Sequence, residues 1–116
     1  MKLWIDDIRP APEKGVIWCK SVNEAKDFIQ KWENHSKIWE NVSGLTQECI
    51  ERKTTLLIDL DHDAGDYVSD GGDYIKLLDW LEETGRNYPI RIHSMNPVGV
   101  QNMRAIIKRN NWMEVK

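Results

Sequence analysis

Residues 56–78 read LLIDLDHDAGDYVSDGGDYIKLL, and this stretch decides how the 116-residue chain folds. It opens with a continuous aliphatic run, which is typical of a strand buried on both faces of a parallel sheet. It ends in a helix, predicted over residues 73–84, because apolar side chains recur there at the spacing of one helical face: Tyr74, Leu77, Leu78 and Leu81. A strand that leads through a loop into an amphipathic helix indicates a βα unit of an α/β protein.

Strand and helix patterns alternate along the rest of the chain as well. Further strands are predicted at residues 2–6, 16–19, 89–94 and 112–115. One helix follows Ser21, which forms a capping-box pattern with Glu24, and another follows Asn96, an N-cap residue with proline next to it. This order predicts one α/β domain over residues 1–116, a three-layer sandwich in which a mostly parallel sheet carries helices on both faces.

Residues 33–54 do not follow a clean helix or strand period, because polar and glycine residues interrupt the apolar positions. We interpret this region as a connection or an insertion that covers the rim of the domain. One short helix is predicted in it, around residues 45–52.

The composition excludes several classes of function. The net charge is −3, whereas a protein that binds duplex DNA usually presents a basic surface. No apolar run is long enough to cross a membrane. Cys19 and Cys49 have no metal-binding spacing, and without a secretory signal they indicate reduced thiols in a cytoplasmic protein.

Polar side chains follow three of the predicted strands at the point where each strand ends. Asp6 and Asp7 follow the first strand, Asp59 and Asp61 end the central strand, and His93 ends the next one. Ligands bind outside the carboxyl ends of the strands in open parallel sheets, so we expect these side chains to meet at one edge. Carboxylates suit a hard cation, and we predict that Asp7 and Asp59, helped by Asp6, hold Mg²⁺ or Mn²⁺.

The other acidic residues of the loop have a simpler explanation. Aspartate commonly fills turns and supports helix starts. We therefore expect the remaining four to build the loop and the start of its helix: Asp63, Asp66, Asp70 and Asp73.

Two histidines at adjacent strand ends are candidates for acid–base chemistry. Histidine changes its charge near neutral pH, so His62 and His93 suit proton transfer to and from a phosphate ester, in an order that we leave open. For each histidine alone, a structural hydrogen-bonded group is an equally good interpretation. Ser94 is placed to bind a phosphate oxygen, and Asp61 either orients His62 or joins the metal. Arg9 either reaches the same phosphate or lies on the surface.

The arrangement resembles the receiver domain of two-component signalling. Asp6 and Asp7 match the acidic pair that binds metal in that family, Asp59 matches its phospho-acceptor aspartate, and Ser94 matches its conserved hydroxyl residue. The match has gaps. The connection after Asp7 is too short and too rich in proline for the family's first helix, and no lysine follows a fifth strand unless Lys116 fills that role.

Four segments resemble a divergent branch of that superfamily, the cyclic-phosphate processing receiver-like domains: WIDDIRPAP (4–12), IDLDHDAGDY (58–67), GGDY (71–74) and RIHSMNPVG (91–99). The resemblance implies a receiver-like, flavodoxin-type fold and a phosphoesterase that acts on a cyclic phosphate, either a 2′,3′-cyclic RNA end or a cyclic nucleotide. It carries over seven site residues: Asp6, Asp7, Asp59, Asp61, His62, His93 and Ser94. Two other hypotheses stay open: a non-catalytic signalling receiver phosphorylated on Asp59, and a module that sequesters a cyclic nucleotide without turnover.

Overall fold

Four parallel strands form the sheet of this computed structural model, which describes residues 1–40 and 56–116, without the side chains of residues 36–40. The strands are β1 (Lys2–Ile5), β2 (Ile17–Cys19), β3 (Leu57–Leu60) and β4 (Ile90–Ile92). They pair in the order β2-β1-β3-β4, and every neighbouring pair is parallel. The first four predicted strands are therefore confirmed. In place of the strand predicted at residues 112–115, a single parallel bridge joins Glu114 to Ile90.

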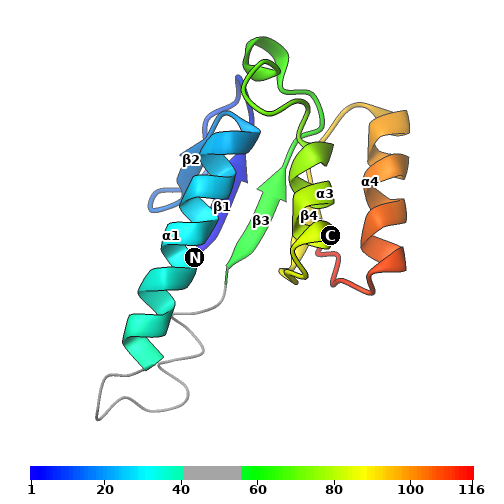
Figure 1. Cartoon of the computed structure of the whole chain (residues 1–116). Helices are drawn as coiled ribbons and strands as arrows, with labels where there is room; N and C mark the ends of the chain where they lie inside the picture. Colours follow the sequence, from blue (N-terminus) through cyan, green and yellow to red (C-terminus); the bar gives the residue numbers. More distant parts are fainter. Residues whose placement is uncertain (41–55) are drawn as a thin grey trace.

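The helices of the described residues connect or follow these strands (Figure 1). They are α1 (Val22–Glu40), α3 (Ile75–Glu83), α4 (Pro97–Arg109) and a turn of 3₁₀ helix, η1 (Gly65–Tyr67). Both predicted caps are confirmed: Ser21 Oγ accepts from the Glu24 amide at 3.1 Å, and Asn96 Oδ1 accepts from the Gly99 amide at 3.0 Å. Helix α1 extends into the region whose sequence shows no clean period, and the helix predicted around residues 45–52 lies outside the described residues.

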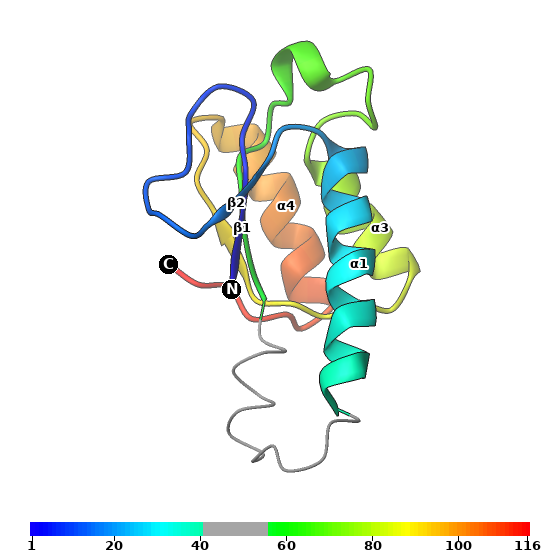
Figure 2. The same ribbon diagram turned by 90° about the vertical axis from the view of Figure 1, so that its left-hand side faces the viewer.

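All three α-helices lie on the same face of the sheet, as the edge-on view of Figure 2 makes plain. Crossovers between parallel strands are right-handed. Because the β2–α1–β3 and β3–α3–β4 crossovers run in the same direction along the sheet, they place their helices on one side. The β1–β2 connection runs in the opposite direction and crosses the other face as a loop (Figure 2). The receiver-like α/β fold is confirmed, with one difference: within the described residues this loop stands where a second helical layer was expected.

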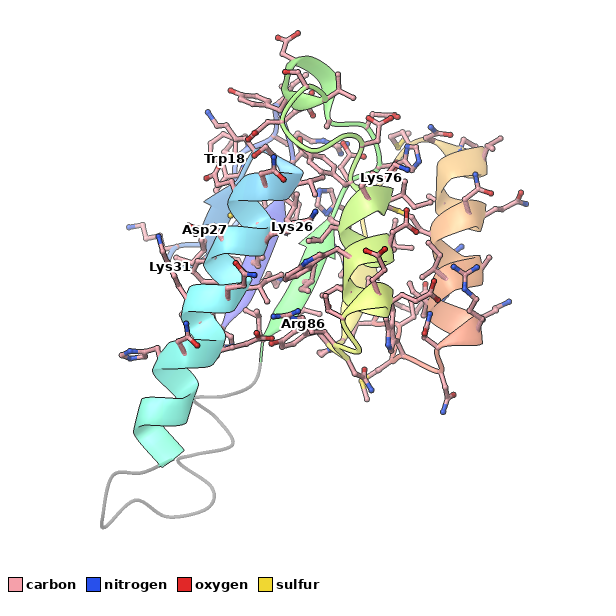
Figure 3. All side chains as sticks on the ribbon, in the orientation of Figure 1. Trp18, Lys26, Asp27, Lys31, Lys76 and Arg86 are labelled. Carbon is pink, nitrogen blue, oxygen red and sulfur yellow. The ribbon has the colours of Figure 1, made fainter. Side chains whose placement is uncertain are left out.

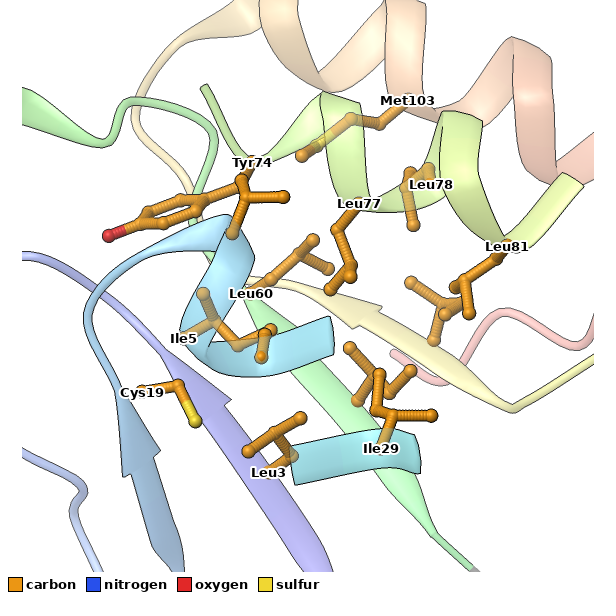
Figure 4. Close-up of a cluster of buried hydrophobic side chains, with 14 of the residues drawn as sticks. Leu3, Ile5, Cys19, Ile29, Leu60, Tyr74, Leu77, Leu78, Leu81 and Met103 are labelled. Carbon is orange, nitrogen blue, oxygen red and sulfur yellow. The ribbon is translucent and has the colours of Figure 1, made fainter. Parts of the chain in front are cut away.

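The helix-covered face forms the hydrophobic core. Side chains alternate along each strand, and Leu3, Ile5, Ile58 and Leu60 are fully buried against the helices. The helices contribute a matching set, which Figure 4 labels: Ile29, Tyr74, Leu77, Leu78, Leu81 and Met103. Burial of one such aliphatic side chain stabilises the fold by roughly 1.5–3 kcal/mol, so this interface holds the two layers together.

The opposite, helix-free face carries aromatic and charged side chains. One residue from each strand forms a row in register across the sheet: Trp18, Trp4, Asp59 and Arg91. The indole N–H of Trp4 donates to the Arg9 carbonyl at 2.9 Å, and that of Trp18 donates to the Asp6 carbonyl at 2.8 Å. The two tryptophans therefore fasten the β1–β2 loop to this face.

A charged contact joins the ends of two helices on the outside of the domain. Arg86, which follows α3, donates to both carboxylate oxygens of Glu33 on α1 at 2.9–3.2 Å (Figure 3). Its guanidinium also lies over the ring of Trp80, 4.3 Å from the ring centroid. A bidentate arginine–carboxylate pair fixes geometry as well as charge, so this contact sets how α1 and α3 lie side by side.

Two expectations from the composition concern thiols and membranes. Cys19, at the end of β2, is a free and buried thiol, and burial raises its pKa to about 12. Cys49 lies outside the described residues. None of the helices in residues 1–40 and 56–116 is both long and apolar enough to cross a membrane.

Candidate metal and phosphate site

Three carboxylates meet at the carboxyl edge of the sheet. Asp6 and Asp7 follow β1, and Asp61 follows β3 alongside them, because its amide donates to the Ile5 carbonyl at 2.9 Å. One carboxylate oxygen from each of the three lies within 4.8 Å of the others. Asp6 and Asp61 are buried and Asp7 is partly exposed. These three residues are called the acidic group below.

Within the acidic group, the pKa values of Asp6 and Asp7 shift in opposite directions. Burial, together with the carboxylates of Asp6 and Asp61, raises the pKa of Asp7. Burial also acts to raise the pKa of Asp6. Hydrogen bonds from the backbone amides of Arg9 and Ile8 and from a histidine ring outweigh that effect, so the pKa of Asp6 lies below its ordinary value.

Arg9 in the β1–β2 loop approaches the acidic group from outside. Its Nε lies 3.4 Å from Asp6 Oδ2, and one terminal nitrogen lies 3.6 Å from Asp61 Oδ2. The side chain is 53% exposed, so solvent screens these contacts and they stabilise the fold little. Of the two interpretations that the sequence left for Arg9, this position favours a role at the site.

The loop after β3 passes so close to Asp7 that it requires a glycine. Gly65 has a φ of +55°, and a Cβ at this position would overlap Asp7 Oδ2. Only glycine combines that backbone conformation with so close an approach. Sequence reasoning missed this residue, although a glycine inside the run DHDAGDY was a visible signal for a tight approach of the backbone.

Two of the four later acidic residues, Asp70 and Asp73, build the loop as predicted. Asp73 Oδ1 accepts from the Ala64 amide at 3.0 Å. The carboxylate of Asp70 accepts from the Ser21 hydroxyl at 2.6 Å and from the Asn23 side-chain amide at 3.1 Å, and these bonds lower the pKa of Asp70. The loop is thereby tied both to itself and to the start of α1.

Asp59 lies outside the acidic group, although the sequence placed it at the metal. It belongs to the row on the helix-free face and is fully buried. Its Oδ2 accepts from Arg91 at 3.0 Å, and its Oδ1 lies 2.6 Å from His93 Nδ1. The register explains the difference, because Asp59 pairs with Trp4, two residues before Asp6. The carboxylate that reaches Asp6 is therefore Asp61.

His93 lies between Asp59 and the acidic group. Besides its contact with Asp59, its Nε2 lies 3.0 Å from Asp6 Oδ2. The ring stacks on Trp4, with centroids 3.8 Å apart and planes 3° from parallel, and the side chain is only 8% exposed. Each ring nitrogen faces a carboxylate oxygen, and a carboxylate accepts hydrogen bonds. Both ring nitrogens of His93 therefore have hydrogen-bond partners within the protein.

His62 belongs to a different hydrogen-bond network. Its Nδ1 lies 2.9 Å from Asp63 Oδ1 and 3.4 Å from the side-chain nitrogen of Asn96. The ring packs against Gly99 in the first turn of α4, where a Cβ would overlap it. Ser94 Oγ accepts from the Asn96 amide at 3.2 Å nearby. The two histidines that the sequence pairs are thus held by separate partners.

The fold and this edge define the class of protein. An all-parallel α/β sheet with carboxylates gathered beyond the ends of its two central strands is consistent with a receiver-like domain. A family model described as the cyclic-phosphate processing Receiver domain matches residues 1–109, and the chain belongs to this family. The resemblance seen in the sequence is confirmed. No curated protein and no solved structure matches the chain significantly.

Proposed function

We propose that this domain is a metal-assisted phosphoesterase that opens a cyclic phosphate, either a 2′,3′-cyclic RNA end or a cyclic nucleotide. The acidic group carries the proposal. Its three carboxylate oxygens lie within 4.8 Å of one another at the edge where open parallel sheets bind ligands. Membership of a cyclic-phosphate processing family supports the choice of substrate class.

The acidic group fits Mg²⁺ or Mn²⁺. All three donors are carboxylate oxygens, which these ions prefer. The pKa of Asp7 is raised by burial and then by the charges of Asp6 and Asp61, and a cation would offset those charges. Asp7 and Asp61 are the better direct ligands. The Asp6 carboxylate already accepts from the amides of Ile8 and Arg9 at 3.0 and 2.9 Å, so fewer of its lone pairs are free. A bound ion supplies charge stabilisation for the phosphate.

His62 is the residue that we assign to proton transfer. Asp63 holds its Nδ1, and its Nε2 makes no hydrogen bond within the described part of the chain. The ring lies at the start of α4, where the amide groups and the helix dipole favour an anion. Ser94 uses its oxygen as an acceptor and keeps its proton for a phosphate oxygen. Of the two histidines that the sequence suggested for proton transfer, the proposal therefore keeps only His62.

A signalling receiver is the second candidate, and the acidic group favours Asp61 over Asp59 as its phosphorylated residue. Asp59 is fully buried, and both of its oxygens are engaged by Arg91 and His93. Asp61 stands next to Asp6 and Asp7, where a metal would accompany a phosphoryl group. A sequestering module, the third candidate, would bind a cyclic nucleotide without turnover.

Phosphorus NMR of the purified chain with 2′,3′- and 3′,5′-cyclic nucleotides tests the proposal. We expect ring opening of one class with Mg²⁺ or Mn²⁺, and its loss with EDTA and in Asp61→Asn. Removing a general acid or base typically slows turnover by about 10²–10⁴-fold, and we expect this of His62→Ala. The matched controls are Asp27→Asn and His35→Ala, because both residues are exposed on α1, and each should retain full activity.

Three outcomes would change this conclusion. Full activity in His62→Ala would remove His62 from proton transfer. Binding of a cyclic nucleotide without products would favour sequestration. No turnover and no binding, together with a stable beryllofluoride adduct on Asp61, would favour the signalling receiver.

A further inference from the structure

A continuous chain of polar contacts runs from the helix-free face of the sheet to the acidic group. It begins at Arg91, which donates to Asp59 Oδ2 at 3.0 Å. Asp59 Oδ1 lies 2.6 Å from Nδ1 of His93, and Nε2 of the same ring lies 3.0 Å from Asp6 Oδ2. The two aspartates joined by this ring are 0% and 1% exposed, so the part of the chain from Asp59 to Asp6 is shielded from solvent.

The imidazole of His93 is also fixed in its plane. It stacks on the indole of Trp4 with centroids 3.8 Å apart, and Trp4 is itself held by the hydrogen bond from its Nε1 to the Arg9 carbonyl. To turn toward a ligand, the ring would have to give up its contact with one oxygen of each of two buried carboxylates. A buried polar group without a partner is strongly disfavoured, so this ring stays in place.

We infer that His93 is a positioning residue, which orients the Asp6 carboxylate in the metal site through Nε2 while Asp59 orients the ring through Nδ1. The inference rests on the proposed function in one respect, that the acidic group holds a divalent cation. Hydrogen-bond partners behind a metal site fix its ligands, and their loss typically weakens metal binding by about 10–100-fold.

Positioning can be separated from a purely electrostatic role. If the imidazole acted on the acidic group only as a nearby positive charge, its removal would strengthen the attraction of the site for a cation. If it holds Asp6 in place, its removal weakens cation binding. The sign of the change in Mn²⁺ affinity therefore distinguishes the two roles.

The experiment is a Mn²⁺ titration of the full chain without substrate, followed by electron paramagnetic resonance of the free ion. His93→Phe keeps an aromatic ring over Trp4 but loses both ring nitrogens, and we expect its Kd to rise about tenfold or more. Asp59→Ala should have a similar effect. Asp59→Asn should stay within about threefold of the wild type, because its amide can donate to Nδ1 and leave the Nε2 proton for Asp6.

Ile58→Ala is the matched control for lost stability. Ile58 precedes Asp59 on β3 but faces the helices, so its truncation weakens the fold without touching the chain of contacts. We expect its Kd for Mn²⁺ to match the wild type. A second measurement needs no variant: nitrogen–proton NMR of the wild type should reveal an Nε2–H proton of His93 that exchanges slowly with water.

Each outcome decides the inference. Unchanged or tighter Mn²⁺ binding in His93→Phe would overturn it, and so would fast exchange of the His93 Nε2–H proton or a wild type that binds no Mn²⁺. Mn²⁺ binding that depends on His93 and Asp59, in a protein that opens no cyclic phosphate, would overturn the proposed function alone.

Discussion

The two faces of the sheet are built from the same strands, yet they hold different chemistry even where both are fully buried. On β3, Ile58 and Asp59 are neighbours and both are 0% exposed. Ile58 packs among the aliphatic side chains of the helix-covered face, whereas Asp59 is bonded to Arg91 and His93 on the helix-free face. Burial alone therefore does not separate stability from function in this domain. What distinguishes a stabilising residue from a functional one here is the set of partners that the buried side chain contacts.

The largest expected effect lies on the helix-covered face. Leu60→Ala removes a fully buried side chain and leaves a cavity, which costs about 2–5 kcal/mol of the free energy of unfolding. Urea denaturation measures this loss. In the fraction that stays folded, the Kd for Mn²⁺ should equal that of the wild type, because Leu60 points away from the acidic group. A stability loss below about 1 kcal/mol would contradict the assignment of this face as the core.

A pair of glycine variants sharpens the comparison at the carboxyl edge. Gly65→Ala and Gly15→Ala both force alanine into a left-handed conformation, which costs roughly 1–2 kcal/mol. A Cβ at Gly65 overlaps Asp7, whereas a Cβ at Gly15 meets no atom within 4 Å. We expect similar stability losses by urea denaturation, but weaker Mn²⁺ binding only in Gly65→Ala. Equal Mn²⁺ affinities in both variants would show that Asp7 does not bind the metal.

A smaller effect is expected where the β1–β2 loop is fastened. Trp4→Phe keeps a ring over His93 but loses the hydrogen bond to the Arg9 carbonyl, which contributes about 0.5–1.5 kcal/mol. The amides of Ile8 and Arg9, both bonded to Asp6 Oδ1, should then exchange faster with deuterium. The control is Trp80→Phe on the helix side. Unchanged exchange at Ile8 and Arg9 in Trp4→Phe would show that the loop is held by other contacts.

The smallest effect concerns charge on the outer surface of the helices and depends on pH. Hydrogen bonds from Arg109 and Asn110 lower the pKa of Glu82 from 4.5 to about 2. Because the folded pKa is the lower one, Glu82 stabilises the fold above pH 4.5, and this contribution is lost as the pH falls toward 2. Over that range, denaturation should reveal a steeper loss of stability in the wild type than in Glu82→Gln. Glu83→Gln is the control, because it removes a neighbouring carboxylate from the same helix without removing Glu82.

Local patterns in the sequence predicted the elements well, because each depends on neighbouring residues. The run before Asp59 predicted a buried strand, and Ser21 and Asn96 predicted two helix starts that their side chains do cap. The number of helical layers was not predictable in the same way. It follows from the strand order through the handedness of the crossovers, and no local pattern encodes that order.

The composition of the site was predicted only in part, for a related reason. Asp59 and Asp61 are two positions apart at the end of one predicted strand, so the sequence pattern places them on one face and makes them look equivalent. Only the register with β1 places Asp61 beside Asp6 and leaves Asp59 opposite Trp4. In the same way, the sequence locates His93 at a strand end, but the contacts that occupy both of its nitrogens come from residues 34 and 87 positions away.

The position of β1 in the middle of the sheet has a consequence for the order of folding events. β1 is the first strand of the chain, and its central partner β3 begins 55 residues later, since Lys2 pairs with Leu57. Pairings across such long loops form slowly, because the chain must lose much of its freedom before the contacts stabilise it. The acidic group combines residues from both strands, so it cannot exist before this pairing. The protein therefore acquires its site in the same slow event that joins its two central strands.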